Sequence, residues 1–96
     1  MPRQLKSFQT ASQISFEQDQ TRQITLMTLQ TSDRPGLLSL IGQAFAENRL
    51  RLNNARIATA GAEAHDTFAI TDRNGQPISD QQELDKLAAV IRSKLD

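Results

Sequence analysis

Apolar residues recur at two different spacings along the chain, and these spacings predict both strands and helices. Residues 13–17 alternate polar and apolar, which predicts a short half-buried strand. Residues 23–31, QITLMTLQT, are β-branched and apolar on both faces, which favours a central strand covered on each side. From Asp33 the spacing becomes helical, and we expect this helix to end near Asn48, a residue that tolerates left-handed backbone. Its apolar stripe consists of Leu37, Leu38, Leu40, Ile41, Ala44 and Phe45.

The second half of the chain repeats the pattern of strand followed by helix. We expect strands over 52–60 and 64–72, joined by a turn at Gly61. The residues predicted to point inward are Ala55 and Ile57 in the first strand and Phe68 and Ile70 in the second. Asn74-Gly75 is a strong signal for a tight turn, and Pro77 prevents simple continuation of the strand.

A second helix is expected from about Asp80 to the end of the chain. Its start offers two capping boxes, one from Ser79 with Gln82 and one from Asp80 with Glu83. Its apolar stripe consists of Leu84, Leu87, Ala88, Ile91 and Leu95.

The order of the elements predicts an α+β fold. Without the first strand the order is βαββα, one strand short of the ferredoxin-like βαββαβ unit. A strand at 13–17 can take the place of the missing fourth strand. We therefore expect one domain over 13–96, with a four-stranded antiparallel sheet and two helices on one face, preceded by a flexible arm or linker remnant over 1–12.

The sheet face without helices has to receive one of two apolar pairs of the central strand. These are Ile24 with Leu26, or Met27 with Leu29. A monomer would leave either pair in water, so we expect a second copy or another domain to cover this face.

Composition narrows the class of function. The chain has 96 residues, which is enough for one domain, and its eleven basic residues balance eleven acidic ones. This balance argues against nucleic-acid or anionic-membrane partners, and no apolar run approaches the roughly 20 residues that span a bilayer. The absence of cysteine removes disulfides and thiolate chemistry and agrees with a cytoplasmic location.

The sequence contains few candidate catalytic residues. The pair His65-Asp66 resembles a metal-phosphohydrolase motif, but such sites need further histidines and His65 is the only one in the chain. Ser39 and Ser79 lack a nearby histidine in the sequence, and no glycine-serine loop with clustered aspartates is present for nucleotidyl transfer. We expect no catalytic residue, no metal and no cofactor in this domain. A loose basic group, Arg49, Arg51 and Arg56, fits either salt bridges or contact with an anion.

The segment SDRPGLLSLIG, residues 32–42, has two interpretations. In the first it is only a capped helix start: Asp33 accepts hydrogen bonds from the first N–H groups, Pro35 lies in the first turn and Gly36 allows the bend. In the second, Gly36 lets a ligand approach those N–H groups, which favour a carboxylate. Composition agrees with both.

The run from Ile24 to Asp72 resembles an ACT domain, a small regulatory module that binds amino acids. The resemblance depends on DRPGLL and on the later A-x-I-x-T-x-G, formed by Ala55, Ile57, Thr59 and Gly61. The extra first strand, the segment TDRNGQPIS and the ending in a helix are most similar to the C-terminal ACT domain of the bifunctional PII uridylyltransferase/uridylyl-removing enzyme family. That resemblance covers residues 13–96.

The resemblance implies a function and a site. Members of that family attach UMP to the PII signal protein and remove it according to the glutamine level, and Mg²⁺ is expected only in their catalytic domains. The implied ligand is a small amino acid, most plausibly glutamine, and the implied partner is a second ACT domain in the parent protein or in a homodimer. The implied ligand-binding residues are Asp33, Arg34, Gly36, Leu37, Leu38, Arg51 and Asn53; Arg51 stands where many members have asparagine.

Two alternatives remain at this point. The same sheet could serve as a structural module that pairs with a sister domain and binds no ligand. The chain could also be the ACT domain of another regulator, such as a guanosine polyphosphate synthetase/hydrolase.

Overall fold

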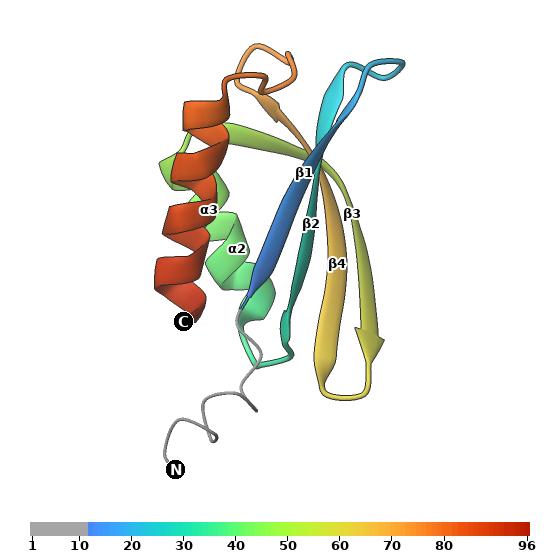
Figure 1. Cartoon of the computed structure of the whole chain (residues 1–96), viewed down its shortest axis with the longest axis vertical. Helices are drawn as coiled ribbons and strands as arrows, with labels where there is room; N and C mark the ends of the chain where they lie inside the picture. Colours follow the sequence, from blue (N-terminus) through green and yellow to red (C-terminus); the bar gives the residue numbers. More distant parts are fainter. Residues whose placement is uncertain (1–11) are drawn as a thin grey trace.

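A computed structural model describes residues 12–96 and has two layers, a sheet and a pair of helices on one of its faces (Figure 1). The four strands of the sheet lie in the order β1-β2-β4-β3, and every neighbouring pair is antiparallel. This confirms the predicted α+β ferredoxin-like fold. The elements are β1 (Gln13–Asp19), β2 (Ile24–Ser32), α2 (Leu37–Glu47), β3 (Leu50–Ala60), β4 (Glu63–Asp72) and α3 (Gln81–Leu95).

Strand β1 occupies the edge position that the fourth strand holds in a complete ferredoxin-like unit. It pairs with β2 over its whole length, from Gln13 opposite Gln30 to Asp19 opposite Ile24. Most of the predicted arm lies outside the described residues. Its last residue, Ser12, is buried: its Oγ lies 2.8 Å from Thr31 Oγ1 and donates a hydrogen bond to Asp96 Oδ1 at 2.9 Å. This contact ties the start of β1 to the end of α3.

The core lies between the sheet and the helices. Met27 and Leu29 of β2 are completely buried there, and Phe68 and Ile70 of β4 are buried as predicted. The rings of Phe45 and Phe68 meet edge to face with their centroids 5.5 Å apart, a favourable aromatic geometry. The predicted stripe of α3 is buried throughout, at Leu84, Leu87, Ala88, Ile91 and Leu95. In α2 the prediction is correct for Leu37, Ile41, Ala44 and Phe45 but wrong for Leu38, which is 50% exposed, while Leu40 is half-buried.

The helix-free face of the sheet receives the other apolar pair of β2. Because Met27 and Leu29 point to the helices, the alternation of the strand directs Ile24 and Leu26 to the opposite face, where both are half-buried. The residues paired with this side of β2 include Ala69 and Thr67. This face is therefore less apolar than the central strand alone indicates.

Ala55 and Ile57 have the predicted inward direction, but neither is buried. Both lie on the helix side of the sheet, since Ala55 pairs with Phe68 and Ile57 with Asp66, but both are exposed, and Ile57 retains 48% of its accessible surface. The reason is the position of β3, which is an edge strand paired only with β4. The pattern gives the direction of each side chain, whereas its burial depends on how far the helices extend over the sheet.

The first helix begins later than predicted. Its N-cap is Gly36 with φ 77°, and no side chain caps it, so the predicted capping role of Asp33 is wrong. The helix ends at Asn48 as predicted, but the left-handed residue is the following one, Arg49, with φ 59°. In α3 the structure selects Asp80 as the cap, and its carboxylate accepts a hydrogen bond from the Gln82 N–H at 2.9 Å.

Candidate functional site

A hydrogen bond connects the loop between β2 and α2 to the turn between β3 and β4. The Asp33 N–H donates to the Ala62 carbonyl at 2.8 Å, which joins this loop to the β3–β4 turn. Gly36 then adopts left-handed backbone, a conformation that glycine reaches without a steric penalty. A Cβ built at Gly36 would meet no atom within 4 Å, so the bend opens onto free space. The glycine therefore leaves the start of α2 accessible.

Within α2 itself, two backbone N–H groups lack an acceptor among residues 12–96. The Leu37 N–H reaches the Arg34 carbonyl at 3.3 Å, and the regular helical bonds begin with the Leu40 N–H, which donates to the Gly36 carbonyl. The N–H groups of Leu38 and Ser39 lie between them and have no partner in the described chain. Such unpaired donors, together with the helix dipole, attract anions.

A cavity of about 260 Å³ opens beside these groups, and we call it the Gly36 cavity. Its second wall comes from β3 and β4, because Ile57 pairs with Asp66 and Thr59 pairs with Ala64 on the helix side of the sheet. The full lining consists of Asp33, Arg34, Gly36, Leu37, Leu38, Ser39, Ile57, Thr59, Ala64 and Asp66.

Asp66 is the most unusual residue of this wall. It is only 1% exposed. Its Oδ1 accepts one long hydrogen bond, 3.3 Å from the Ala58 N–H, and its Oδ2 has no partner among the described residues. Burial raises the pKa of this carboxyl above its ordinary value of 3.8, and the negative charge of Asp33 adds to the effect, while the Ala58 hydrogen bond and His65 oppose it. The cavity thus contains a buried acid that the protein itself does not fully satisfy.

The structure brings together all the predicted site residues except Arg51 and Asn53. Arg51 lies toward the other end of β3, where it shares a shallow depression with Arg49, Leu50 and Arg73. The Asn53 side chain donates to Thr71 Oγ1 at 3.1 Å. Neither residue lines the Gly36 cavity.

Several lining residues were absent from the predicted site. Ile57 and Thr59 belong to the A-x-I-x-T-x-G pattern, which therefore carried the signal for them. Asp66 was considered only as the partner of His65 in a metal motif, although alternation with the buried Phe68 places it on the helix face. His65 points to the other face, where its ring lies 3.2 Å from Glu63. His65 and Asp66, although adjacent in sequence, therefore lie on opposite faces of the sheet.

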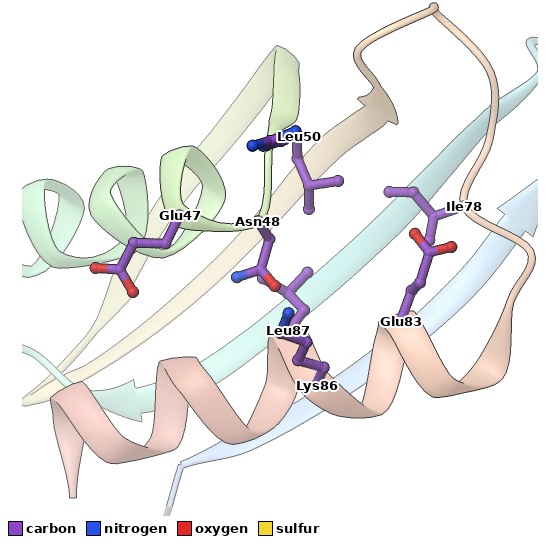
Figure 2. A pocket seen from close by; sticks show the side chains of 8 residues that line it. Glu47, Asn48, Leu50, Ile78, Glu83, Lys86 and Leu87 are labelled. Carbon is purple, nitrogen blue, oxygen red and sulfur yellow. The ribbon is translucent and has the colours of Figure 1, made fainter.

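A second cavity lies at the opposite end of α2 and measures about 480 Å³; we call it the Asn48 cavity. Figure 2 shows it between the end of α2, the start of β3 and the first turns of α3. Glu47, Arg49, Glu83 and Lys86 place charges of both signs around it, and Leu50, Ile78 and Leu87 provide apolar surface. Figure 2 also shows Asn48 at the junction of α2 and β3; its side-chain amide donates to the Ala44 carbonyl at 2.8 Å.

Residues 12–96 contain neither a membrane-crossing helix nor a cluster of metal ligands. No helix in this part of the chain is both long and apolar enough to cross a membrane. The same residues contain no group of three or more histidine, aspartate or glutamate side chains arranged to hold a metal ion.

Comparison with a solved structure supports the fold. A crystal structure of an unknown protein from Galdieria sulphuraria superimposes with a TM-score of 0.61 over 76% of this chain and 39% of that one, at 16% sequence identity. At this identity the likeness concerns the fold alone.

Comparison with known sequences relates the chain to part of a longer enzyme. No family model matches. The bifunctional uridylyltransferase/uridylyl-removing enzymes of Pseudomonas syringae pv. tomato and Azotobacter vinelandii are 46% and 41% identical to it over 95 residues. Each alignment covers 99% of this chain but only 11% of the relative's length. The chain is therefore homologous to one short region of the bifunctional uridylyltransferase/uridylyl-removing enzymes, which confirms the family resemblance inferred from its sequence.

Proposed function

We propose that this chain is a non-catalytic ACT domain that binds a small amino acid, with glutamine as the first choice, in the Gly36 cavity. It would control the activities of a longer uridylyltransferase/uridylyl-removing enzyme in the cytoplasm. The observation that carries the proposal is the cavity itself. It collects Asp33, Arg34, Gly36, Leu37 and Leu38, the residues that the ACT resemblance implies, around two unpaired N–H groups.

The chemistry of the helix start supports an amino acid as the ligand. The ligand's carboxylate would accept hydrogen bonds from the Leu38 and Ser39 N–H groups, whose position at the positive end of the helix dipole favours a negative charge. The cavity volume of about 260 Å³ lies just below the range of about 300–1,000 Å³ typical of drug-sized ligands. A metabolite of amino-acid size fits that space.

The position of the cavity next to β3 links binding to domain pairing. The exposed large apolar side chains, Leu38, Leu52 and Ile57, belong to α2 and β3, and the outer edge of β3 has no strand partner within the described sheet. We infer that a second ACT domain pairs along β3 and covers these side chains. Because Leu38 and Ile57 also line the Gly36 cavity, an occupied cavity would change the surface that the partner meets. Regulation follows if the ligand binds the two pairing states with different affinities.

Calorimetric titration of the full 96-residue chain with glutamine tests the proposal. Thr59→Trp places a large side chain in the cavity from an exposed strand position, whereas Ala58→Trp places the same side chain on the opposite face of the sheet. We expect wild type and Ala58→Trp to bind glutamine and Thr59→Trp to lose about thirtyfold or more in affinity. Equal affinity in all three proteins would exclude the Gly36 cavity as the site.

The rival function, a pairing module without a ligand, gives a different result. In a sample shown by sedimentation to be dimeric, the absence of both heat and thermal shift with millimolar glutamine would favour it. For the parent protein, the relatives named above favour a uridylyltransferase/uridylyl-removing enzyme over a guanosine polyphosphate synthetase/hydrolase.

A further inference from the structure

The Asp66 carboxylate holds the one buried side-chain polar atom within residues 12–96 that has no hydrogen-bond partner, and it lies in the wall of the Gly36 cavity. Its Oδ2 has no hydrogen-bond partner in the described chain, and its Oδ1 has only the 3.3 Å contact with the Ala58 N–H. An ionised carboxylate in such a place is costly unless a cation or several donors compensate for it. The fold therefore keeps an acid where an apolar residue would be more stable.

The charged groups around Asp66 do not supply this compensation. Asp33, in the loop before α2, carries the same charge and raises the pKa of Asp66. Arg34 lines the same cavity but makes no ion pair with Asp66. His65 is the next residue along β4, and its ring contacts Glu63 on the other side of the sheet. A cation that enters the Gly36 cavity, which Asp66 lines, would supply the compensation.

We propose that Asp66 receives the α-ammonium group of the amino acid whose carboxylate binds the Leu38 and Ser39 N–H groups. The inference rests on the proposed function and extends it. The cavity has donors for an anion on α2 and an acceptor for a cation on β4. In an α-amino acid the carboxylate and the ammonium group are attached to the same carbon atom. The ligand class is thus a zwitterion, and a carboxylic acid without the amine is discriminated against.

Binding requires a small movement of the acid. Oδ2 is shielded from solvent in this conformation, so the carboxylate has to turn about its side-chain torsions to meet an ammonium group. The carboxylate is held by one hydrogen bond, from the Ala58 N–H, and its length of 3.3 Å exceeds the usual 2.7–3.2 Å of N–H···O contacts. A charge-assisted hydrogen bond to the ligand is stronger than the contact that would be disturbed.

Paired ligands test this proposal on the wild-type chain. The probes are glutamine and 5-amino-5-oxopentanoate, which keeps the carboxylate and the side-chain amide of glutamine but lacks its amine. We expect the wild-type chain to bind glutamine at least about tenfold more tightly than the analogue. Equal affinity for the two probes would overturn the inference and leave the carboxylate site at α2 standing, whereas failure to bind either probe would overturn the proposed function as well.

A matched pair of variants assigns the preference to Asp66. Asp66→Asn removes the charge at nearly constant shape, and Asp85→Asn makes the same change on the exposed surface of α3. We expect Asp66→Asn to reduce the preference for glutamine to about twofold or less, mainly through weaker glutamine binding, and Asp85→Asn to keep it. Circular dichroism and the melting temperature verify that both variants fold. An unchanged preference in a folded Asp66→Asn variant would contradict the assignment.

The pH dependence of binding gives an independent measurement. Protonated Asp66 cannot pair with an ammonium group, and its pKa is raised by burial. Glutamine affinity should therefore weaken on acidification at a higher pH than an ordinary aspartate would cause, and Asp66→Asn should show no such step. A profile that is the same in wild type and Asp66→Asn would count against the proposal.

Discussion

The two ends of helix α2 each open onto a cavity, but they differ in how well the protein satisfies its own polar groups. At the Asn48 end, the Asn48 N–H donates to the Ala44 and Phe45 carbonyls, the Arg49 N–H donates to that of Ala46, and the Asn48 side chain adds a further bond to Ala44. Glu47 there is paired with Lys94 at 2.7 Å. At the Gly36 end, two N–H groups and one carboxylate oxygen have no partner within residues 12–96.

This difference identifies a binding site better than size does. The Asn48 cavity is the larger, at about 480 Å³ against about 260 Å³. Its backbone N–H groups and the Asn48 side chain, however, have partners within the chain, and its charged side chains Arg49, Glu83 and Lys86 are exposed to water, so a ligand gains little by replacing these contacts. The smaller cavity contains helix-start N–H groups and a buried carboxylate oxygen that have no partner within residues 12–96, and a ligand with both charges can pair with them. Binding energy is therefore available at the Gly36 end.

The largest expected effect comes from filling the Gly36 cavity with an aromatic side chain, and the same change in the Asn48 cavity is the control. Lys86→Trp fills the Asn48 cavity from an exposed position on α3, and we expect its glutamine affinity to stay within about twofold of wild type. Thr59→Trp, in the Gly36 cavity, should lose about thirtyfold or more, which corresponds to about 2 kcal/mol. Calorimetry compares the two, and a reversed order would move the site to the Asn48 end.

The second effect concerns the bend at Gly36. Gly36→Ala forces a left-handed backbone on alanine, which costs about 1–2 kcal/mol, although no atom blocks the added methyl group. Gly42→Ala, within the same helix and equally free of contacts, should instead stabilise the protein by about 0.5–1 kcal/mol. Urea denaturation measures both. Similar stabilities for the two variants would show that the left-handed bend is not under steric constraint.

A third effect is a gain of stability when the unsatisfied acid is removed. The folded-state pKa of Asp66 is raised, so the folded state binds its proton more tightly than the unfolded state does. Its contribution to stability therefore falls as the pH rises from the unfolded value of 3.8 through the folded value. We expect Asp66→Asn to be more stable than wild type at pH 7 by about 1 kcal/mol, or about 4–8 °C in melting temperature, and to lose this part of the pH dependence.

That gain would be a trade between stability and binding, because the same substitution is expected to weaken glutamine binding. Asp85→Asn, on the exposed surface of α3, should change neither quantity appreciably. Asp66→Asn melting below wild type at pH 7 would mean that the ionised carboxylate stabilises the fold and needs no ligand.

The smallest effect belongs to the satisfied end of the helix. Glu47→Gln removes the charge that pairs with Lys94, but the Glu47 side chain is 54% exposed, so we expect a loss of less than about 0.5 kcal/mol and no change in glutamine affinity. Denaturation at low and high salt is a sufficient test. A loss above 1 kcal/mol would show that the charge network at the Asn48 end is more strongly coupled than its exposure implies.

The sequence predicted the order of the elements and, except for Leu38 and Leu40, the helical stripes, because these depend on local periodicity. The edge position of β1 followed from the ferredoxin-like order of the elements. The prediction failed at β3, where the inward direction of Ile57 did not bring burial, since burial depends on the reach of the helices. It also failed at Asp33, because the left-handed Gly36 places the helix start beyond the reach of that side chain. The local sequence pattern carries no information on how far the helices extend over β3 or on how far Asp33 lies from the first N–H groups of α2.

The candidate site was predicted in part for the same reason. Asp33 to Leu38 are contiguous and keep their proximity in the fold, whereas Arg51 and Asn53 were placed by analogy and lie elsewhere. Asp66 was not predicted as a site residue, because its proposed role depends on a buried oxygen without a hydrogen-bond partner, which is a property of the packed structure.

Whether an amino acid binds at the Gly36 end of α2 can be read from the backbone amide signals of the isotope-labelled chain, followed by NMR while glutamine is added. We expect the largest shifts at the amides of Leu38 and Ser39 and at those of Thr59 and Asp66 across the cavity, while the amides of Asn48 and Arg49 keep their positions. Saturating shifts confined to Asn48, Arg49 and Lys86 would contradict this expectation.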